Sequence, residues 1–173
     1  APPPPTNTHP PPAPPTPSTH SRPHNPTLPG GGGYSRAEYL KKKGYFKSLG
    51  NHVYLQPWNF GTESHLISFG DNVHVASGVT FVNHDITCMM FNYMDKEHHY
   101  KLRQGEITIG NNVFIGAKST VLYDVTIGDN VIIGAGSLVN KDIPSGTVAA
   151  GVPCRVIGKF EDYQQKMKKE ESE

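Results

Sequence analysis

Hydrophobic and polar positions repeat every six residues between residues 107 and 142. The third place of each block of six is always aliphatic: Ile109, Ile115, Val121, Ile127, Ile133 and Val139. The fourth place is mostly glycine: Gly110, Gly116, Gly128 and Gly134. A helix cannot generate a period of six residues, whereas a coil of three short strands can, because each block then supplies one strand and one corner. The pattern predicts a parallel β-helix in which the third-place side chains point inward and stack on their equivalents one coil away.

The same frame recurs upstream and is then interrupted. Residues 67–84 form three further blocks, whose third places are Phe69, Val75 and Phe81. The next third-place residue after Phe81 is Ile109, and the interval between these two positions is not a multiple of six. Long interruptions of a regular solenoid are usually binding loops. We therefore expect the chain to leave the coil in an excursion loop at 85–106.

Different signals mark the two ends of the coil. Ser35-Arg36-Ala37-Glu38 has the form of a capping box and Gly44 is a stop signal, which predicts a short helix within a helical cap at 34–48. The polar segment 159–173 favours a C-terminal helical cap, which protects the unpaired strand edge of the last coil. The coil itself is expected to occupy residues 49–158.

The N-terminal segment, 1–33, differs in composition from the rest of the chain. Residues 1–29 hold 13 of the 16 prolines and no acidic residue, and four glycines follow them. They offer no apolar set to bury, so we expect residues 1–33 to be a disordered arm or a linker.

Bulk properties exclude several classes of partner. The formal net charge is only +1, which favours neither nucleic acid nor an anionic membrane. No apolar run is long enough to insert into a membrane, and no secretory signal pattern precedes the repeats. The two cysteines, Cys88 and Cys154, have no metal-binding or redox spacing, so a reducing cytoplasmic location is expected.

The six-residue pattern, Ile143-Pro144 and the closing segment AAGVPCRVIG at 149–158 resemble the hexapeptide-repeat acyltransferases. The chain is most similar there to the galactoside and maltose O-acetyltransferases and to the capsular-polysaccharide O-acetyltransferases. The resemblance implies an all-β fold, a left-handed parallel β-helix with a short N-terminal helix and a C-terminal helix. The left hand comes from the resemblance alone, because parallel crossovers are generally right-handed. It also implies a homotrimer with active sites between adjacent subunits, acetyl-CoA as the donor, a hydroxyl as the acceptor, and no metal.

The resemblance places the catalytic residue at His84, where regular coils give way to the excursion. A neutral imidazole there acts as general base, taking the hydroxyl proton during direct transfer. Asp85 or a backbone carbonyl is expected to hold the other ring nitrogen, and Asn83 is a further candidate beside it. Trp58 and Glu63 are acceptor-side candidates, because an aromatic ring stacks on a pyranose and a carboxylate accepts from hydroxyls. Core packing of Trp58 and a solvated Glu63 are equal alternatives.

Donor-side candidates also follow from the resemblance. Ala117 and Ala135 align with places where the coil backbone of the family binds the pantetheine arm. Asn140 and Lys141 align with a Thr-Lys pair that contacts coenzyme A, and Arg155 aligns with a further basic contact. Cations near the end of the coil suit the phosphate charge of coenzyme A. An exposed charge at a corner of the coil is the alternative for Lys141 and Arg155.

The leading interpretation is an O-acetyltransferase that moves acetyl from acetyl-CoA to a sugar or polysaccharide hydroxyl. An N-acetyltransferase of an amino-sugar uses the same fold and is the first alternative. A zinc-dependent carbonic anhydrase is less favoured. It would bind zinc through three histidines across a subunit interface, and the candidates are His52, His65, His74 and His84, but the closing segment at 149–158 argues against it. A non-catalytic solenoid is the last alternative, since a fold does not fix a function.

Overall fold

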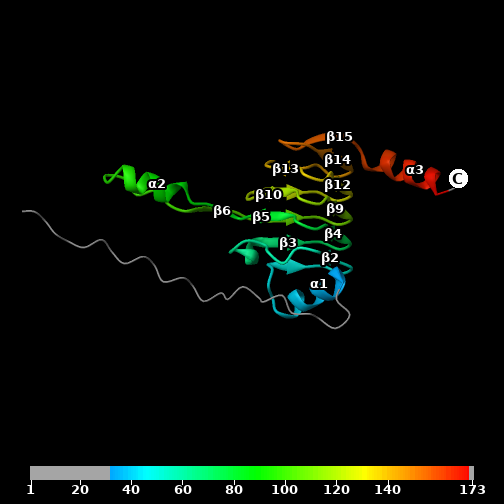
Figure 1. The fold of residues 1–173 in the computed structure, drawn as a ribbon, viewed down its shortest axis with the longest axis horizontal. Helices are drawn as coiled ribbons and strands as arrows, with labels where there is room; N and C mark the ends of the chain where they lie inside the picture. The colour runs from blue at the N-terminus through cyan, green and yellow to red at the C-terminus, as the bar shows by residue number, and fades with distance from the viewer. Residues whose placement is uncertain (1–31, 172–173) are drawn as a thin grey trace, which may run out of the picture.

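The computed structural model describes residues 32–171, and Figure 1 shows a stack of short strands with a helix near each end. Sheet A contains β1 (Ser48–Leu49), β3 (Ile67–Phe69), β8 (Ile107–Ile109) and β11 (Val125–Ile127). Sheet B contains β2 (Tyr54–Leu55), β4 (Val73–Val75), β9 (Val113–Ile115), β12 (Val131–Ile133), β14 (Thr147–Ala150) and β15 (Arg155–Lys159). Sheet C contains β5 (Thr80–Val82), β10 (Thr120–Leu122) and β13 (Leu138–Val139).

The chain visits the three sheets in the order A, B, C and then starts again. Within each sheet the paired strands are parallel, except for β14 and β15, which pair antiparallel at the C-terminal end. In the uninterrupted part, Val113 pairs with Val131, the equivalent position three blocks further along, so one turn takes three blocks of six. These pairings agree with the predicted coil of three short strands.

The core is a column of inward-pointing side chains. All six third-place residues of the 107–142 repeat are at most 2% exposed, which confirms their predicted inward direction. At the N-terminal end the column becomes aromatic, where Phe46 packs edge-on against Phe60 and Phe69, and Phe60 stacks on Phe81. Glycine in the fourth place has a steric reason, because a Cβ on Gly116 would lie 2.5 Å from the backbone nitrogen of Ala135.

A ladder of asparagines runs along the corner between sheets A and B. Asn72, Asn112 and Asn130 all have φ near +55°, in the left-handed region that asparagine tolerates better than most residues. Asn72 Nδ2 donates to Asn112 Oδ1, and Asn112 Nδ2 donates to Asn130 Oδ1, each at 2.9 Å. At this corner, the backbone conformation and the side-chain hydrogen bonds therefore recur from turn to turn, as the core positions do.

Helix α1 (Gly33–Lys42) begins earlier than the sequence predicts. Its N-cap is Gly32 and no side chain caps it, so the predicted capping box at Ser35–Glu38 is wrong. The predicted stop is correct. Gly44 has φ +59° and its N–H donates to the Lys41 carbonyl, while Tyr45 N–H donates to the Leu40 carbonyl. These two bonds form a Schellman motif. Residues 1–31, which make up most of the predicted arm, lie outside the described residues.

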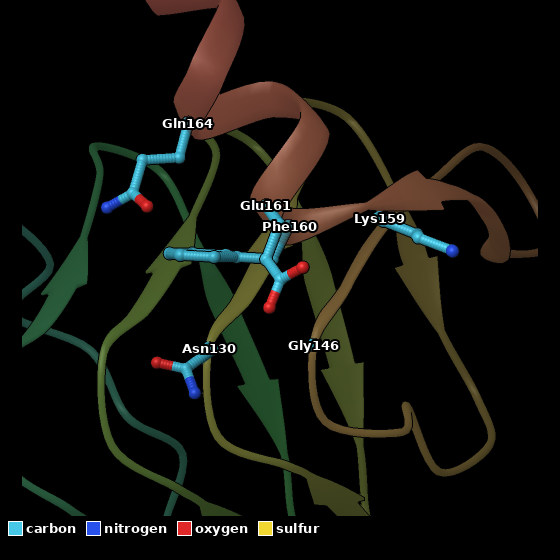
Figure 2. A pocket seen from close by; sticks show the side chains of 6 residues that line it. All are labelled: Asn130, Gly146, Lys159, Phe160, Glu161 and Gln164. Atoms are coloured by element: carbon cyan, nitrogen blue, oxygen red, sulfur yellow. The ribbon is translucent and has the colours of Figure 1, made fainter. Parts of the chain in front are cut away.

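At the other end, helix α3 (Phe160–Glu170) follows β15 directly and buries none of its side chains. Its first turn and the corner at Asn130 line an open cavity, shown in Figure 2. Residues 172 and 173, at the end of the predicted C-terminal cap, are outside the described part of the chain.

The interruption of the repeat is an arm that stands out from the coil, on the side opposite α3 (Figure 1). Its stem is an antiparallel pair of short strands, β6 (His84–Asp85) and β7 (Arg103–Gln104). Its outer part holds α2 (Thr87–Met94), and the chain rejoins the coil at Ile107. A short 3₁₀ helix, η1 (Ser64–Leu66), precedes β3.

Candidate active site

His84 lies where the chain leaves sheet C, in the first strand of the stem. Its Nδ1 is 2.6 Å from Oε2 of Glu63, and Thr62 Oγ1 lies further away, at 3.4 Å from the same nitrogen. A carboxylate can only accept a hydrogen bond, so Nδ1 carries the proton and the lone pair of a neutral ring is at Nε2. The His84 side chain is 30% exposed and that of Glu63 is 18% exposed. The site therefore holds a half-buried imidazole in one tautomer, whose Nε2 has no hydrogen-bond partner among residues 32–171.

Glu63 stays ionised in this setting. Its burial favours the neutral acid, but hydrogen bonds from Thr62 and His84 outweigh burial and lower the pKa of the carboxyl below its ordinary value of 4.5. A permanent negative charge at Nδ1 stabilises an imidazolium, which is the form that His84 takes after it accepts a proton.

The structure does not bring the Asp85 side chain to the ring of His84. Asp85 Oδ1 accepts a 2.8 Å hydrogen bond from the backbone N–H of Thr87, and this bond is the main cause of the lowered pKa of Asp85. Successive side chains of a strand point to opposite faces, so Asp85 and His84, both in β6, face different ways. Glu63, which the sequence placed on the acceptor side, occupies the orienting position instead.

Asn83 is buried directly before the catalytic candidate. Its backbone carbonyl accepts from Gly105 N–H at 3.0 Å, which ties the two ends of the arm together. Its side-chain oxygen and nitrogen have no hydrogen-bond partner among residues 32–171. Gly61, with φ +78°, passes so close that a Cβ there would lie 2.6 Å from Asn83 Oδ1. Asn83 therefore supports the junction from inside and is too buried to contact an acceptor.

Trp58 packs against the N-terminal helix. The guanidinium of Arg36 lies 4.2 Å from the ring centroid of Trp58, and its Nη1 also donates to the carbonyl of Leu55. Burial lowers the pKa of Arg36. One face of the half-buried indole is thus covered by a cation.

The donor-side candidates lie on two corners of the coil. Ala117 and Ala135 are one turn apart on the corner between sheets B and C, where Gly136 N–H donates to the Ala117 carbonyl at 2.8 Å. Arg155 joins them there, because it pairs with Ala150 at the end of β14. Its Nη1 donates to the carbonyl of Cys154 at 2.7 Å.

Asn140 and Lys141 lie on the next corner, between sheets C and A. Thr120 pairs with Thr80 on one side and with Leu138 on the other, so Asn140 and Lys141 follow β13 at the corner where His84 follows β5. Both residues are exposed. The sequence-predicted catalytic and donor residues therefore border one face of the coil, that of sheet C.

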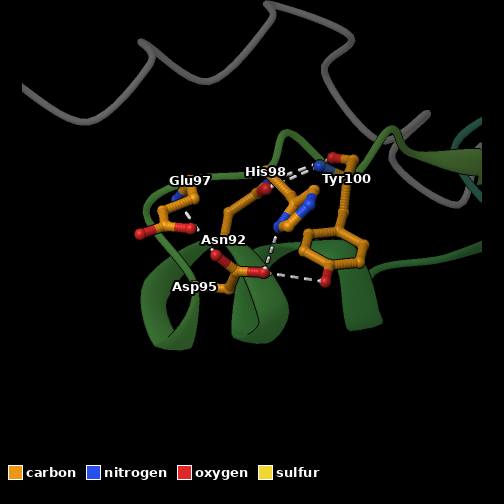
Figure 3. A network of polar contacts seen from close by, with 5 residues as sticks. All are labelled: Asn92, Asp95, Glu97, His98 and Tyr100. Carbon is orange, nitrogen blue, oxygen red and sulfur yellow. Dashed lines mark hydrogen bonds and ion pairs between the residues drawn. The ribbon is translucent and has the colours of Figure 1, made fainter.

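The outer end of the arm carries a polar network that the sequence did not predict, shown in Figure 3. Asp95 Oδ2 accepts from His98 Nδ1 at 2.7 Å and from the hydroxyl of Tyr100 at 3.1 Å. Asn92 bonds both the N–H and the carbonyl of Tyr100. A hydrogen bond from the backbone N–H of Glu97, followed by the bond from His98, lowers the pKa of Asp95. These bonds give the end of a long loop a defined conformation.

The histidines named for the carbonic anhydrase alternative do not form a metal cluster within one copy of the chain over residues 32–171. In the described range, 32–171, no three side chains of the metal-binding types lie close enough to share an ion. His74 stacks on Tyr54 with ring centroids 5.8 Å apart, and His84 is held by Glu63. Nor does this range contain a helix that is long and apolar enough to cross a membrane.

The chain is similar to known transferases built from six-residue repeats. The family model of the bacterial transferase hexapeptide (six repeats) matches residues 106–141. Protein CapG of Staphylococcus aureus is 42% identical over 110 residues, which cover 62% of this chain and 61% of CapG. Galactoside O-acetyltransferase of Escherichia coli (strain K12) is 37% identical over 147 residues, covering 69% of this chain and 67% of the enzyme. The chain thus spans about two thirds of the length of these two curated relatives.

Solved structures agree. A maltose O-acetyltransferase from Clostridium difficile 630 superposes with a TM-score of 0.56 at 32% identity, covering 73% of this chain and 75% of the other. A galactoside acetyltransferase in complex with coenzyme A superposes with a TM-score of 0.51 at 28% identity, covering 76% of this chain and 82% of the other.

Proposed function

Because the chain belongs to the hexapeptide-repeat acetyltransferases, we propose that it transfers an acetyl group from acetyl-CoA to a hydroxyl of a sugar or polysaccharide unit. The observation that carries the proposal is the His84–Glu63 pair, a half-buried imidazole with Nδ1 bound to a carboxylate and Nε2 free. Galactoside and maltose O-acetyltransferases among the matched proteins support the choice of a sugar hydroxyl as the acceptor.

His84 acts as general base and then as general acid. Its Nε2 takes the hydroxyl proton while the hydroxyl oxygen forms a bond to the acetyl carbon of the thioester. The carbon–sulfur bond breaks, and the imidazolium returns the proton to the leaving sulfur, so the products are the acetyl ester and free coenzyme A. Glu63 keeps the ring in the tautomer that the first step needs and stabilises the positive charge between the two steps.

The donor is expected along the corner that holds Ala117 and Ala135. Their small side chains leave the coil backbone accessible there, which suits hydrogen bonding to an extended amide chain. Arg155, Asn140 and Lys141 are exposed polar groups toward the C-terminal end and are proposed to bind the phosphates and the nucleotide part of the donor.

The proposal includes the assembly and the setting of the enzyme. It takes the coil to be left-handed and the active unit to be a homotrimer whose sites lie between subunits. A cytoplasmic location is consistent with Cys88 and Cys154, which are both buried free thiols.

A transfer assay with acetyl-CoA and a panel of sugars, amino-sugars and polysaccharide fragments tests this function. We expect ester formation on a hydroxyl, and we expect His84→Ala to lower kcat by about two to four powers of ten, the usual range for a lost general base. Acetyl-CoA binding and thermal stability are expected to stay near the wild-type values. Acetylation of an amine instead would favour the N-acetyltransferase alternative, and full activity in His84→Ala would contradict the mechanism.

A further inference from the structure

The cavity at the C-terminal end of the coil (Figure 2) is lined by none of the residues assigned to the reaction above. Its volume is about 410 Å³, within the range of about 300–1,000 Å³ that is typical of small-ligand sites. The corners of the coil and the start of α3 line it together: Asn130, Gly146, Lys159, Phe160, Glu161 and Gln164.

The backbone fixes the walls of this cavity. Phe160 N–H donates to the carbonyl of Gly146 at 3.0 Å, and Lys159 pairs with Thr147 across the β14–β15 ladder. The first residue of α3 is thereby joined to a corner of the coil. Since α3 buries none of its side chains, its first turns contribute to a surface rather than to the core.

The asparagine ladder ends at the cavity with an unused donor. Asn130 Oδ1 accepts from Asn112 Nδ2, but within residues 32–171 no acceptor pairs with Nδ2 of Asn130 itself. Gln164 adds a second amide from α3, and it has no side-chain hydrogen bond within the same range. Two planar amides, each able to donate and accept, therefore line the cavity from opposite elements.

The charges around the cavity favour a neutral polyol over an anion. Figure 2 shows the carboxylate of Glu161 on the same side of the Phe160 ring as Asn130, while the ammonium group of Lys159 points away. A carboxylate without a facing cation repels phosphates and acids, but it accepts hydrogen bonds from hydroxyl groups. The Phe160 ring supplies a flat apolar surface next to these polar groups.

We propose that this cavity is a second carbohydrate-binding subsite, which holds a pyranose unit of a glycan away from the reacting hydroxyl. Phe160 supplies the stacking surface, Asn130 and Gln164 bond the ring hydroxyls in both directions, and Glu161 accepts from them. The choice of a glycan rests on the proposed function, because an enzyme that acetylates oligosaccharides or polysaccharides meets many pyranose units in one substrate. The subsite raises the affinity for long acceptors by binding them at a second place.

Binding of the full chain to an array of bacterial surface-glycan fragments tests this subsite without any transfer reaction. The wild-type protein is expected to bind a subset of the oligosaccharides, and Gln164→Ala and Phe160→Ala to bind them at least tenfold more weakly. Gln165→Ala is the matched control, because Gln165 is also exposed on α3 but does not line the cavity. His84→Ala is expected to retain binding, which separates the subsite from the catalytic site.

Three results would overturn the subsite: no glycan bound by the wild type, equal binding by the Gln164 and Gln165 variants, or loss of binding in His84→Ala. Gln164→Ala keeps the test decisive if Phe160→Ala fails to fold, because the Gln164 side chain is exposed. Array binding that depends on Gln164 in a protein that acetylates no sugar would support the subsite and reject the proposed function.

Discussion

In the proposed mechanism, the role of His84 depends on which ring nitrogen can accept a proton. The carboxylate of Glu63 settles this by accepting from Nδ1, although the two residues are far apart in the sequence. The contact forms because the segment before β3 passes beside the corner at which the arm leaves the coil. A single hydrogen bond therefore decides whether this histidine can serve as a base.

Glu63→Gln is expected to lower kcat by about 10- to 1,000-fold, with little change in the KM for acetyl-CoA. The amide removes the negative charge that stabilises the imidazolium, and its NH₂ group can bond the ring in the wrong tautomer. Steady-state kinetics measure the effect. Asp85→Asn is the matched control and is expected to keep near wild-type activity, because Asp85 bonds Thr87 and not the ring. Equal losses in both variants would contradict the assignment of Glu63.

Glu63→Gln is also expected to change how the stability of the fold depends on pH in acid. The pKa of Glu63 is lower in the folded chain than its ordinary value of 4.5, so the ionised carboxylate stabilises the fold above about pH 4.5. This contribution is lost as the pH falls from there through the folded pKa. We expect the melting temperature of Glu63→Gln to fall less steeply below pH 4.5 than that of the wild type. If the melting temperatures of the variant and the wild type fell in parallel with pH, the ionised carboxylate would not stabilise the fold.

Lys141→Glu tests the donor side. Lys141 is exposed at the same corner of the coil as His84, so its replacement is not expected to disturb the core. The loss of a cation and the gain of an anion next to phosphate groups predict a KM for acetyl-CoA about 10- to 100-fold higher, with little change in the acceptor KM. Lys42→Glu, on the exposed side of α1, makes the same charge change elsewhere. A rise in both KM values alike would count against a donor contact.

The sequence marks the position of His84 but not the residue that bonds its ring, for reasons that are physical. His84 occupies a recognisable position in a repeat, at the end of a regular coil. Asp85 looked like a partner because it is adjacent in sequence, yet the alternation of side chains in a strand turns it away. Glu63 lies in an irregular segment without periodicity, so no local sequence pattern predicts its contact with the His84 ring.

At the scale of the elements, the corners of the coil are as regular as its strands. Asn112 shows this, because it holds a left-handed backbone, accepts from Asn72 and donates to Asn130. An alanine at this position loses both hydrogen bonds and also strains the backbone, whereas a glycine loses the bonds without the strain.

We therefore expect Asn112→Ala to lower the free energy of unfolding by about 2–4 kcal/mol, and Asn112→Gly by roughly 1 kcal/mol less. Urea unfolding of the two variants beside the wild type measures both values. The order of the two variants is the informative result. If glycine were the more destabilising, backbone strain at the corner would not be the deciding effect.

Element prediction succeeded where the period is long and missed the start of the N-terminal helix. Six blocks in register predicted that the third-place side chains point inward, and all six are buried. The start of α1 depended on one local motif, Ser35–Glu38, and the helix instead begins at Gly33, where a Cβ would lie 2.8 Å from the Tyr54 ring. Close packing against β2, rather than the capping motif, therefore determines where α1 begins. The network at the end of the arm joins side chains at irregular spacings, and no repeat marks it.

At the scale of the whole molecule, the outward faces of the coil differ in chemistry. Sheet A presents small polar side chains in register: Ser48, Ser68, Thr108 and Thr126. Sheet B presents a mostly apolar column in register: Tyr54, His74, Phe114, Ile132 and Val148. Phe114, in the middle of that column, is 45% exposed in the single chain. A continuous apolar patch on a protein surface usually marks an interface with another protein. Sheet B is therefore the face on which the proposed trimer is expected to form.

Phe114→Lys tests this assembly, because it places an unpaired charge at the centre of the sheet B face while leaving the inward side chains of β9 unchanged. We expect light scattering after size exclusion to show three copies for the wild type and one for the variant. Acetyl transfer is expected to be lost with the trimer, since the proposed sites lie between subunits. Thr126→Lys adds the same charge on the sheet A face and is expected to leave both mass and activity unchanged. A trimeric, active Phe114→Lys would show that sheet B faces solvent, and dissociation by Thr126→Lys alone would move the interface to sheet A.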